Sequence, residues 1–170
     1  MSIIKVLVVD DSALVRSILR EELQREADIE VMATVPDVYA ARDRIVLEKP
    51  DVVTLDIEMP KMDGVEFLRR LMPQFPVPVV IVSALATAHA ELTLQALQYG
   101  AIDFVTKPSA RLGTALTGMV KELTGKIRAA AKVNVEHYRK QTQQISRQPI
   151  RNAALARSTD KIVAIGASTG

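Results

Sequence analysis

Residues 50–64 read PDVVTLDIEMPKMDG, and this stretch decides the fold. The segment Val52 to Leu55 is β-branched or apolar at every position rather than at alternate ones, which is typical of a strand in a parallel sheet covered by helices on both faces. Asp56 ends this strand, and a helical period begins at Gly64 and continues to Met72. The stretch therefore predicts a short buried strand, an acidic residue at its end, and a helix.

The same succession of strand and helix recurs on both sides of this stretch. Ser12 is placed to cap a helix with apolar residues at helical spacing, and Gly100 is placed to stop another. Further strands are predicted at residues 3–9, 29–35, 78–82 and 102–106, and further helices at residues 12–23, 36–46 and 89–99.

The number of these units determines the fold class. Five strand–helix units in about 125 residues fit an α/β fold with a doubly wound, five-stranded parallel sheet. A closed βα barrel would need eight units and roughly 250 residues. The sequence therefore predicts an open sheet and excludes the barrel.

The part of the chain after Pro108 divides differently. A helical period runs from Leu112 to Ala130, although three glycines within it make its ends hard to place. We expect a first domain at residues 1–125 and a basic, partly helical linker at residues 126–159. Residues 160–170 contain a new apolar run, which we expect to be the first strand and turn of a second, truncated α/β domain.

Charge divides the chain at nearly the same place. Residues 1–124 carry 13 lysines and arginines against 18 aspartates and glutamates, a net charge of −5. Residues 125–170 carry 9 against 2, a net charge of +7. The overall charge of +2 therefore hides an acidic body and a basic tail, and the tail is interpreted as a solvated linker rather than a nucleic-acid-binding element.

Composition excludes several classes of site. The chain has no cysteine and two histidines, His89 and His137, so thiolate or histidine-rich metal sites are excluded. It has no apolar stretch of 18 residues and no signal-peptide pattern, so we expect a cytoplasmic protein without membrane insertion.

Polar residues follow the predicted strands at the point where each strand ends. Asp10 and Asp11 follow the first strand, Asp56 the third, Ser83 the fourth and Lys107 the fifth. In open α/β sheets ligands bind beyond the carboxyl ends of the strands, so these side chains should converge in one crevice.

Three clustered carboxylates repel one another unless a cation lies among them, and oxygen ligands without cysteine or histidine favour Mg²⁺. With Lys107 and the Ser83 hydroxyl added, the set suits a phosphoryl group, with an aspartate as the nucleophile. Each residue alone has an ordinary alternative as a turn, a helix cap or a solvated charge. Coincidence at four strand ends is the weaker explanation for all five together.

Four motifs extend this reading: VLVVDDS, PDVVTLDIEMPKMDG, VVIVSA and GAIDFVTKP. In this order and spacing they resemble a two-component receiver domain with a CheY- or flavodoxin-like fold, over roughly residues 1–125. The resemblance implies that Asp56 accepts the phosphoryl group and that Ser83 and Lys107 bind its oxygens. It also implies a cis peptide bond between Lys107 and Pro108 and a Mg²⁺ site made by Asp10, Asp11, Asp56 and the backbone carbonyl of Glu58. Phe104 occupies the position of an aromatic residue whose burial accompanies signalling, although a plain core ring is an equal alternative.

The end of the chain carries a second resemblance. TDKIVAIGASTG, residues 159–170, is similar to the opening strand and nucleophile turn of the chemotaxis methylesterase family CheB. The family's nucleophile corresponds to Ser168, in a G-x-S-x-G pattern after an apolar strand. Because the histidine and aspartate of that triad lie downstream of the serine, we expect no methylesterase activity from this polypeptide, and its own enzymatic status stays open.

These resemblances imply a set of partners: a CheA-like histidine kinase as phosphodonor, and an esterase domain and chemoreceptors in the intact protein. No nucleic acid is expected as a partner, and the surface left by the absent esterase domain could support homodimers. Two alternatives remain, a stand-alone signalling receiver and the receiver of a DNA-binding response regulator.

Overall fold

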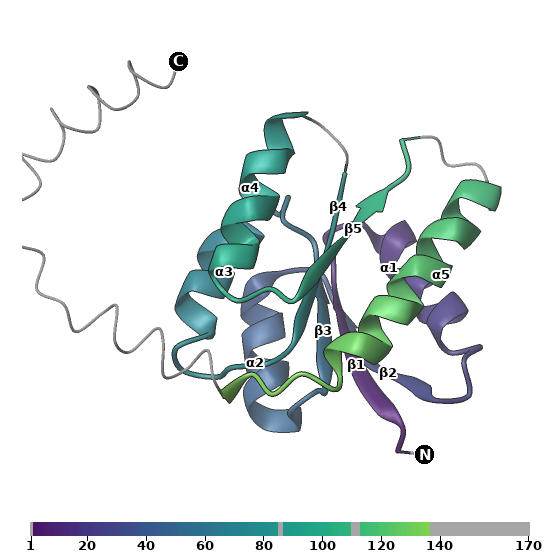
Figure 1. Cartoon of the computed structure of the whole chain (residues 1–170), viewed down its shortest axis with the longest axis horizontal. Helices are drawn as coiled ribbons and strands as arrows, with labels where there is room; N and C mark the ends of the chain where they lie inside the picture. Colours follow the sequence, from purple (N-terminus) through teal and green to yellow (C-terminus); the bar gives the residue numbers. More distant parts are fainter. Residues whose placement is uncertain (1, 85–86, 110–112, 137–170) are drawn as a thin grey trace, which may run out of the picture. The chain divides into compact units, whose positions relative to one another are not determined.

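A computed structural model of the protein describes residues 2–84, 87–109 and 113–136. Its centre is a parallel five-stranded sheet in the order β2-β1-β3-β4-β5 (Figure 1). The strands are β1 (Ile4–Val9), β2 (Ile29–Val35), β3 (Val52–Leu55), β4 (Val79–Ala84) and β5 (Asp103–Lys107). The predicted doubly wound sheet is confirmed.

Four helices that connect the strands and one that follows the last strand cover both faces of the sheet (Figure 1). They are α1 (Ala13–Leu23), α2 (Val38–Glu48), α3 (Gly64–Leu71), α4 (Thr87–Gln98) and α5 (Gly113–Ala130). Helices α1 and α5 lie on one face, and α2, α3 and α4 on the other. No helix in the described part of the chain combines the length and apolar character needed to cross a membrane.

The core consists of two layers because successive side chains of a strand point to opposite faces. In β1, Leu7 and Val9 pack toward α2 and α3, whereas Val6 and Val8 pack toward α1 and α5. The four side chains are at most 1% exposed. This explains why the strands are apolar at consecutive positions and confirms that both faces are buried.

The helix starts are fixed by short polar side chains. The Ser12 hydroxyl accepts a hydrogen bond from the amide of Val15, and Asp37 and Asp63 cap α2 and α3 in the same way. Each satisfies an amide that has no partner within the helix. The predicted cap at Ser12 is confirmed.

Several element boundaries differ from the predicted ones. Strand β4 continues through Ser83 to Ala84, and Lys107 is the last residue of β5 rather than the residue after it. The reason is that these residues extend the parallel ladder, in which Ser83 is opposite Thr106 and Ala84 is opposite Lys107. Both site residues thus sit on rigid strand backbone rather than on a loop.

Helix α5 begins at Gly113 and runs through residue 125, the expected domain boundary, to Ala130. The predicted second-domain strand and Ser168 lie outside the described residues.

The strand order creates a topological switch point in the sheet. Strand β1 lies between β2 and β3, and the connections on its two sides leave along opposite faces of the sheet. In doubly wound sheets a crevice opens at this switch point, beyond the carboxyl ends of the strands. The ends of β1 and β3 carry Asp10 and Asp56.

Candidate functional site

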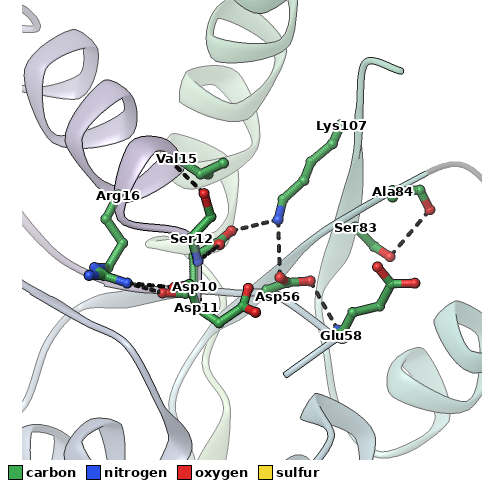
Figure 2. Close-up of polar contacts among 10 residues, drawn as sticks. All are labelled: Asp10, Asp11, Ser12, Val15, Arg16, Asp56, Glu58, Ser83, Ala84 and Lys107. Carbon is green, nitrogen blue, oxygen red and sulfur yellow. Dashed lines mark hydrogen bonds and ion pairs between the residues drawn. The ribbon is translucent and has the colours of Figure 1, made fainter. Parts of the chain in front are cut away.

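Three carboxylates lie together at this point. Asp10 and Asp11 follow β1, Asp56 follows β3, and one carboxylate oxygen of each lies within 4.8 Å of the others. Asp10 and Asp56 are 1% and 3% exposed, whereas Asp11 faces solvent. The predicted convergence of these side chains is therefore seen in the structure (Figure 2).

Lys107 reaches into the same cluster from the end of β5. Its Nζ lies 2.6 Å from Asp10 Oδ2 and 3.1 Å from Asp56 Oδ2. Asp10 Oδ2 is buried, and this ammonium forms an ion pair with it. With all groups ionised, one ammonium against three carboxylates leaves two negative charges, which a divalent cation would balance.

The electrostatics of the cluster are governed by burial. Burial raises the pKa of Asp56 from its ordinary 3.8 to about 6, against the opposing attraction of Lys107 and with a further upward contribution from Asp10. Burial alone would lower the pKa of Lys107, but the hydrogen bond to Asp10 and the charge of Asp56 raise it. Lys107 therefore stays an ammonium, while Asp56 titrates just below neutral pH.

Hydrogen bonds from nearby backbone amides orient the two buried carboxylates. Asp56 Oδ1 accepts a hydrogen bond from the amide of Glu58 at 3.0 Å, and Asp10 Oδ1 accepts one from the amide of Ser12 at 2.9 Å. In each residue one oxygen is held by the following loop and the other faces Lys107. Turns of this kind hold a carboxylate in one orientation.

Gly64 fixes the loop that follows Asp56, a role that the sequence reading missed. A Cβ at this position would lie 2.7 Å from the carbonyl oxygen of Asp56 and 2.9 Å from Cα of Ile57. Both neighbours are backbone atoms, so neither can move aside cheaply. The Gly64 amide also donates to the carbonyl of Ile57 at 2.9 Å, and the start of α3 is thereby held against the residue that carries the carboxylate.

Ser83 lies at the same edge of the sheet, on β4. It is 5% exposed, and its hydroxyl donates to the carbonyl of Ala84 at 3.4 Å (Figure 2). The hydroxyl is thus near the crevice but bonded to its own strand. Its predicted bond to a phosphoryl oxygen stays a prediction, and so does the metal-binding role of the Glu58 carbonyl.

The donor set fits a hard divalent cation. Its members are carboxylate oxygens alone, one ammonium leaves their charge unbalanced, and one of the three carboxylates is open to solvent. Asp10, Asp11 and Asp56 could therefore hold Mg²⁺.

Two expectations about β5 need revision. The described residues contain no cis peptide bond, so the predicted cis bond between Lys107 and Pro108 is wrong. The trans form is the intrinsically favoured one even before proline, by about 0.5–1 kcal/mol. Phe104 is 41% exposed, so the alternative of a plain core ring is also wrong.

The Phe104 ring is held at the surface by a lysine of α5. Lys126 Nζ lies 5.1 Å from the ring centroid, 3.1 Å from Asp103 Oδ1 and 3.0 Å from Glu122 Oε1. An ammonium over an aromatic face is attracted by the ring electrons. The outward position of Phe104 is therefore compatible with an aromatic residue that changes its exposure, a role that stays a prediction.

Comparison with known proteins agrees with this geometry. The family model of the response regulator receiver domain matches residues 6–117. The chain belongs to the response regulator receiver family. The solved response regulator domain of Thermotoga maritima CheB is 39% identical, with a TM-score of 0.71 over 78% of this chain and 98% of that one.

Curated relatives extend the similarity beyond the receiver. A protein-glutamate methylesterase/protein-glutamine glutaminase of Syntrophotalea carbinolica is 51% identical over 98% of this chain and 48% of its own length. The chain thus spans about half the length of the curated relatives it matches. The receiver is of the type found in these CheB proteins, and the two alternative outputs are less well supported.

A further similar structure is that of a protein complex. The complex of the P1 domain of CheA3 with CheY6 from R. sphaeroides contains a chain 28% identical to this one, with a TM-score of 0.63 over 78% of this chain and all of that one. A relative of this fold therefore docks with a domain of a CheA protein.

Proposed function

We propose that this chain is a phosphorylation switch in which Asp56 accepts a phosphoryl group from a CheA-like histidine kinase. The observation that carries the proposal is a buried carboxylate, Asp56, that shares one ammonium with Asp10 and has a carboxylate oxygen of both Asp10 and Asp11 within 4.8 Å. A cytoplasmic location belongs to the same proposal, since kinases that use ATP work there.

In this mechanism an Asp56 oxygen attacks the phosphorus atom of the kinase phosphohistidine. A P–O bond forms and the P–N bond breaks, with its electron pair left on the imidazole nitrogen. A pKa of about 6 leaves Asp56 mostly ionised at neutral pH, and burial keeps the carboxylate poorly solvated. Both properties favour attack.

Lys107 stabilises the transfer because its ammonium already lies beside the attacking carboxylate and can pair with the incoming phosphoryl oxygens. Asp10, Asp11 and Asp56 would hold Mg²⁺, which supplies charge neutralisation of the phosphoryl oxygens. Ser83 and the Glu58 carbonyl, on the same edge of the sheet, are the further groups of the proposed site. The new charge at the ends of β3 and β5 would then bias the surface that includes Phe104.

The test is intact-mass spectrometry after incubation with acetyl phosphate and Mg²⁺. We expect one added phosphoryl group, absent in Asp56→Asn and in the presence of EDTA. Asp43→Asn, which changes an exposed carboxylate of α2, is the matched control and should be modified like the parent protein. Unmodified protein that still binds Mg²⁺ would contradict the proposal.

The output of the switch is a second part of the proposal. The curated relatives are methylesterases twice as long as this chain, so we infer that the phosphorylation state controls an esterase domain that acts on chemoreceptors, with Ser168 as its nucleophile. The coding sequence beyond codon 170 in the source genome tests this. A downstream histidine and aspartate within an α/β domain are expected, and a helix-turn-helix there would contradict it.

A further inference from the structure

We propose that Arg16 is a positioning residue that holds the loop between β1 and α1 in the shape needed for Asp10 and Asp11 to bind one cation. The inference rests on the proposed function for the identity of that cation, Mg²⁺. It concerns a residue that touches neither the cation nor the phosphoryl group.

The contact that carries the inference is a double one. Arg16 Nη1 donates to the carbonyl oxygen of Asp10 at 2.8 Å and to that of Asp11 at 3.0 Å (Figure 2). A single guanidinium nitrogen thus binds two consecutive backbone carbonyls of the acidic loop. Hydrogen bonds with a charged donor are roughly twice as strong as neutral ones.

This contact imposes a conformation on the loop. In an extended strand, consecutive carbonyls point in opposite directions and consecutive side chains point to opposite faces. Two adjacent carbonyls that meet one donor require the chain to leave the strand geometry at Asp10. With this turn in place, a carboxylate oxygen of Asp10 and one of Asp11 both lie within 4.8 Å of an Asp56 oxygen.

Arg16 is itself firmly placed. Its amide donates to the carbonyl of Ser12 at 3.0 Å, and the Ser12 hydroxyl caps α1 through the amide of Val15. The guanidinium therefore joins the first turns of α1 to the loop, and the Ser12 amide holds the Asp10 carboxylate from the other side. The loop is braced on its backbone and on its side chain.

The positive charge of Arg16 has a second effect. It lies against the backbone of two residues whose carboxylates repel each other and Asp56. A guanidinium is always charged and cannot compete with the cation for its ligands, because it bonds the carbonyls rather than the carboxylates. Arg16 therefore brings the carboxylates together and leaves their oxygens available to the metal ion.

The test measures Mg²⁺ binding by isothermal titration calorimetry in Arg16→Met, with Arg20→Met as the matched control. Arg20 is an exposed arginine of the same helix, one turn further along. Loss of an outer positioning group typically weakens metal binding roughly tenfold or more, and we expect at least a tenfold weaker affinity in Arg16→Met and an unchanged one in Arg20→Met. Equal affinities in the two variants would overturn the inference.

Two further measurements separate positioning from chemistry and from simple folding. At saturating Mg²⁺ the rate of phosphorylation by acetyl phosphate should return to that of the parent protein, since Asp56 and Lys107 are untouched; a rate that stays low would overturn the inference. Amide hydrogen exchange should rise at residues 10–12 in Arg16→Met without a rise in the core strands.

Arg16→Lys keeps the charge on a shorter stem, and it also carries the test if Arg16→Met does not fold. We expect its Mg²⁺ affinity to fall as well, because a lysine does not place a donor between both carbonyls. An unchanged affinity in Arg16→Lys would show that charge alone suffices and would overturn the bridging role. Failure of the proposed function is distinguishable, since the parent protein would then bind Mg²⁺ but take up no phosphoryl group, whereas failure of this inference shows as equal Mg²⁺ affinities in Arg16→Met and Arg20→Met.

Discussion

At each end of the sheet, one positively charged side chain lies between two carboxylates. At the carboxyl end of the strands, Lys107 bridges Asp10 and Asp56 at 2.6 and 3.1 Å. At the opposite end, Arg128 of α5 bridges Glu26 and Asp28, each at 2.7 Å. The distances are alike, but the Asp10 and Asp56 side chains are 2% and 4% exposed, against 41% and 21% for Glu26 and Asp28.

Burial outweighs the effect of the neighbouring cationic side chain in one of the two clusters. The hydrogen bond from Arg128 lowers the pKa of Asp28, which is the ordinary result of a salt bridge at the surface. Burial raises the pKa of Asp56 to about 6 despite Lys107. The Arg128 cluster is a clamp that joins α5 to the turn before β2, whereas the Lys107 cluster contains a carboxylate, Asp56, whose ionised form is costly. That cost favours the proposed transfer of a phosphoryl group to Asp56.

The largest expected effect is that of Lys107→Met. It leaves two buried carboxylates without their cation, so the free energy of unfolding should fall by about 3–5 kcal/mol at pH 7.5 in EDTA. Urea unfolding measures it, and added Mg²⁺ should recover part of the loss. A loss no larger than that of Arg128→Met would break the comparison.

Gly64→Ala should rank second. The added Cβ would meet the backbone of Asp56 and Ile57, so we expect a loss of about 1–3 kcal/mol and weaker phosphorylation of Asp56. The control is Gly118→Ala, where a Cβ meets nothing within 4 Å in α5. That variant should gain roughly 0.5–1 kcal/mol. If urea unfolding shows that Gly64→Ala and Gly118→Ala change the free energy of unfolding in the same direction, the close backbone approach at Gly64 is contradicted.

Asp56→Asn should stabilise the metal-free protein in a pH-dependent manner. Because the pKa of Asp56 is raised in the folded state, ionisation lowers stability as the pH rises from about 4 to about 6. Asparagine cannot ionise, so the variant should gain on the order of 1–2 kcal/mol above pH 6.5 and almost nothing at pH 4. Urea unfolding in EDTA at both pH values measures the gain in stability. A gain that is independent of pH would contradict the raised pKa of Asp56.

The smallest effect is expected from Arg128→Met. The clamp is exposed and its charges are screened, so the loss of stability at pH 7.5 should be well below that of Lys107→Met. The loss should shrink in 1 M NaCl. Because the pKa of Asp28 is lowered in the folded state, the loss should be full above the ordinary pKa of an aspartate and should disappear as the pH falls through the lowered pKa. A loss that persists in high salt would show that Arg128 acts through packing.

The sequence predicted the sheet and the convergence at its edge, because both follow from local patterns. Consecutive apolar positions in VVTL indicate a strand buried on both faces, and the carboxyl ends of parallel strands meet at one edge. Asp10, Asp11, Asp56 and Lys107 could therefore be grouped before any coordinates were known.

The supporting residues could not be found in the same way. Gly64 is required by a backbone approach between segments that the sequence does not place, and Arg16 acts on carbonyls that carry no side-chain signature. The exposure of Phe104 and the trans bond before Pro108 also depend on the path of the chain around β5. The one usable signal for Arg16 was its place one helical turn after the capping Ser12.

The three strands that build the site are far apart in the chain, and this has a consequence for the order of folding. Lys107 is 51 residues from Asp56, so its ammonium joins the cluster only after β5 has paired with β4. Closing such a loop costs chain entropy that local contacts do not offset. A nascent chain that has formed only β1 to β3 already carries the three carboxylates but lacks their counter-ion. If these carboxylates hold Mg²⁺ as proposed, the ion would also supply the missing positive charge before the lysine is in place.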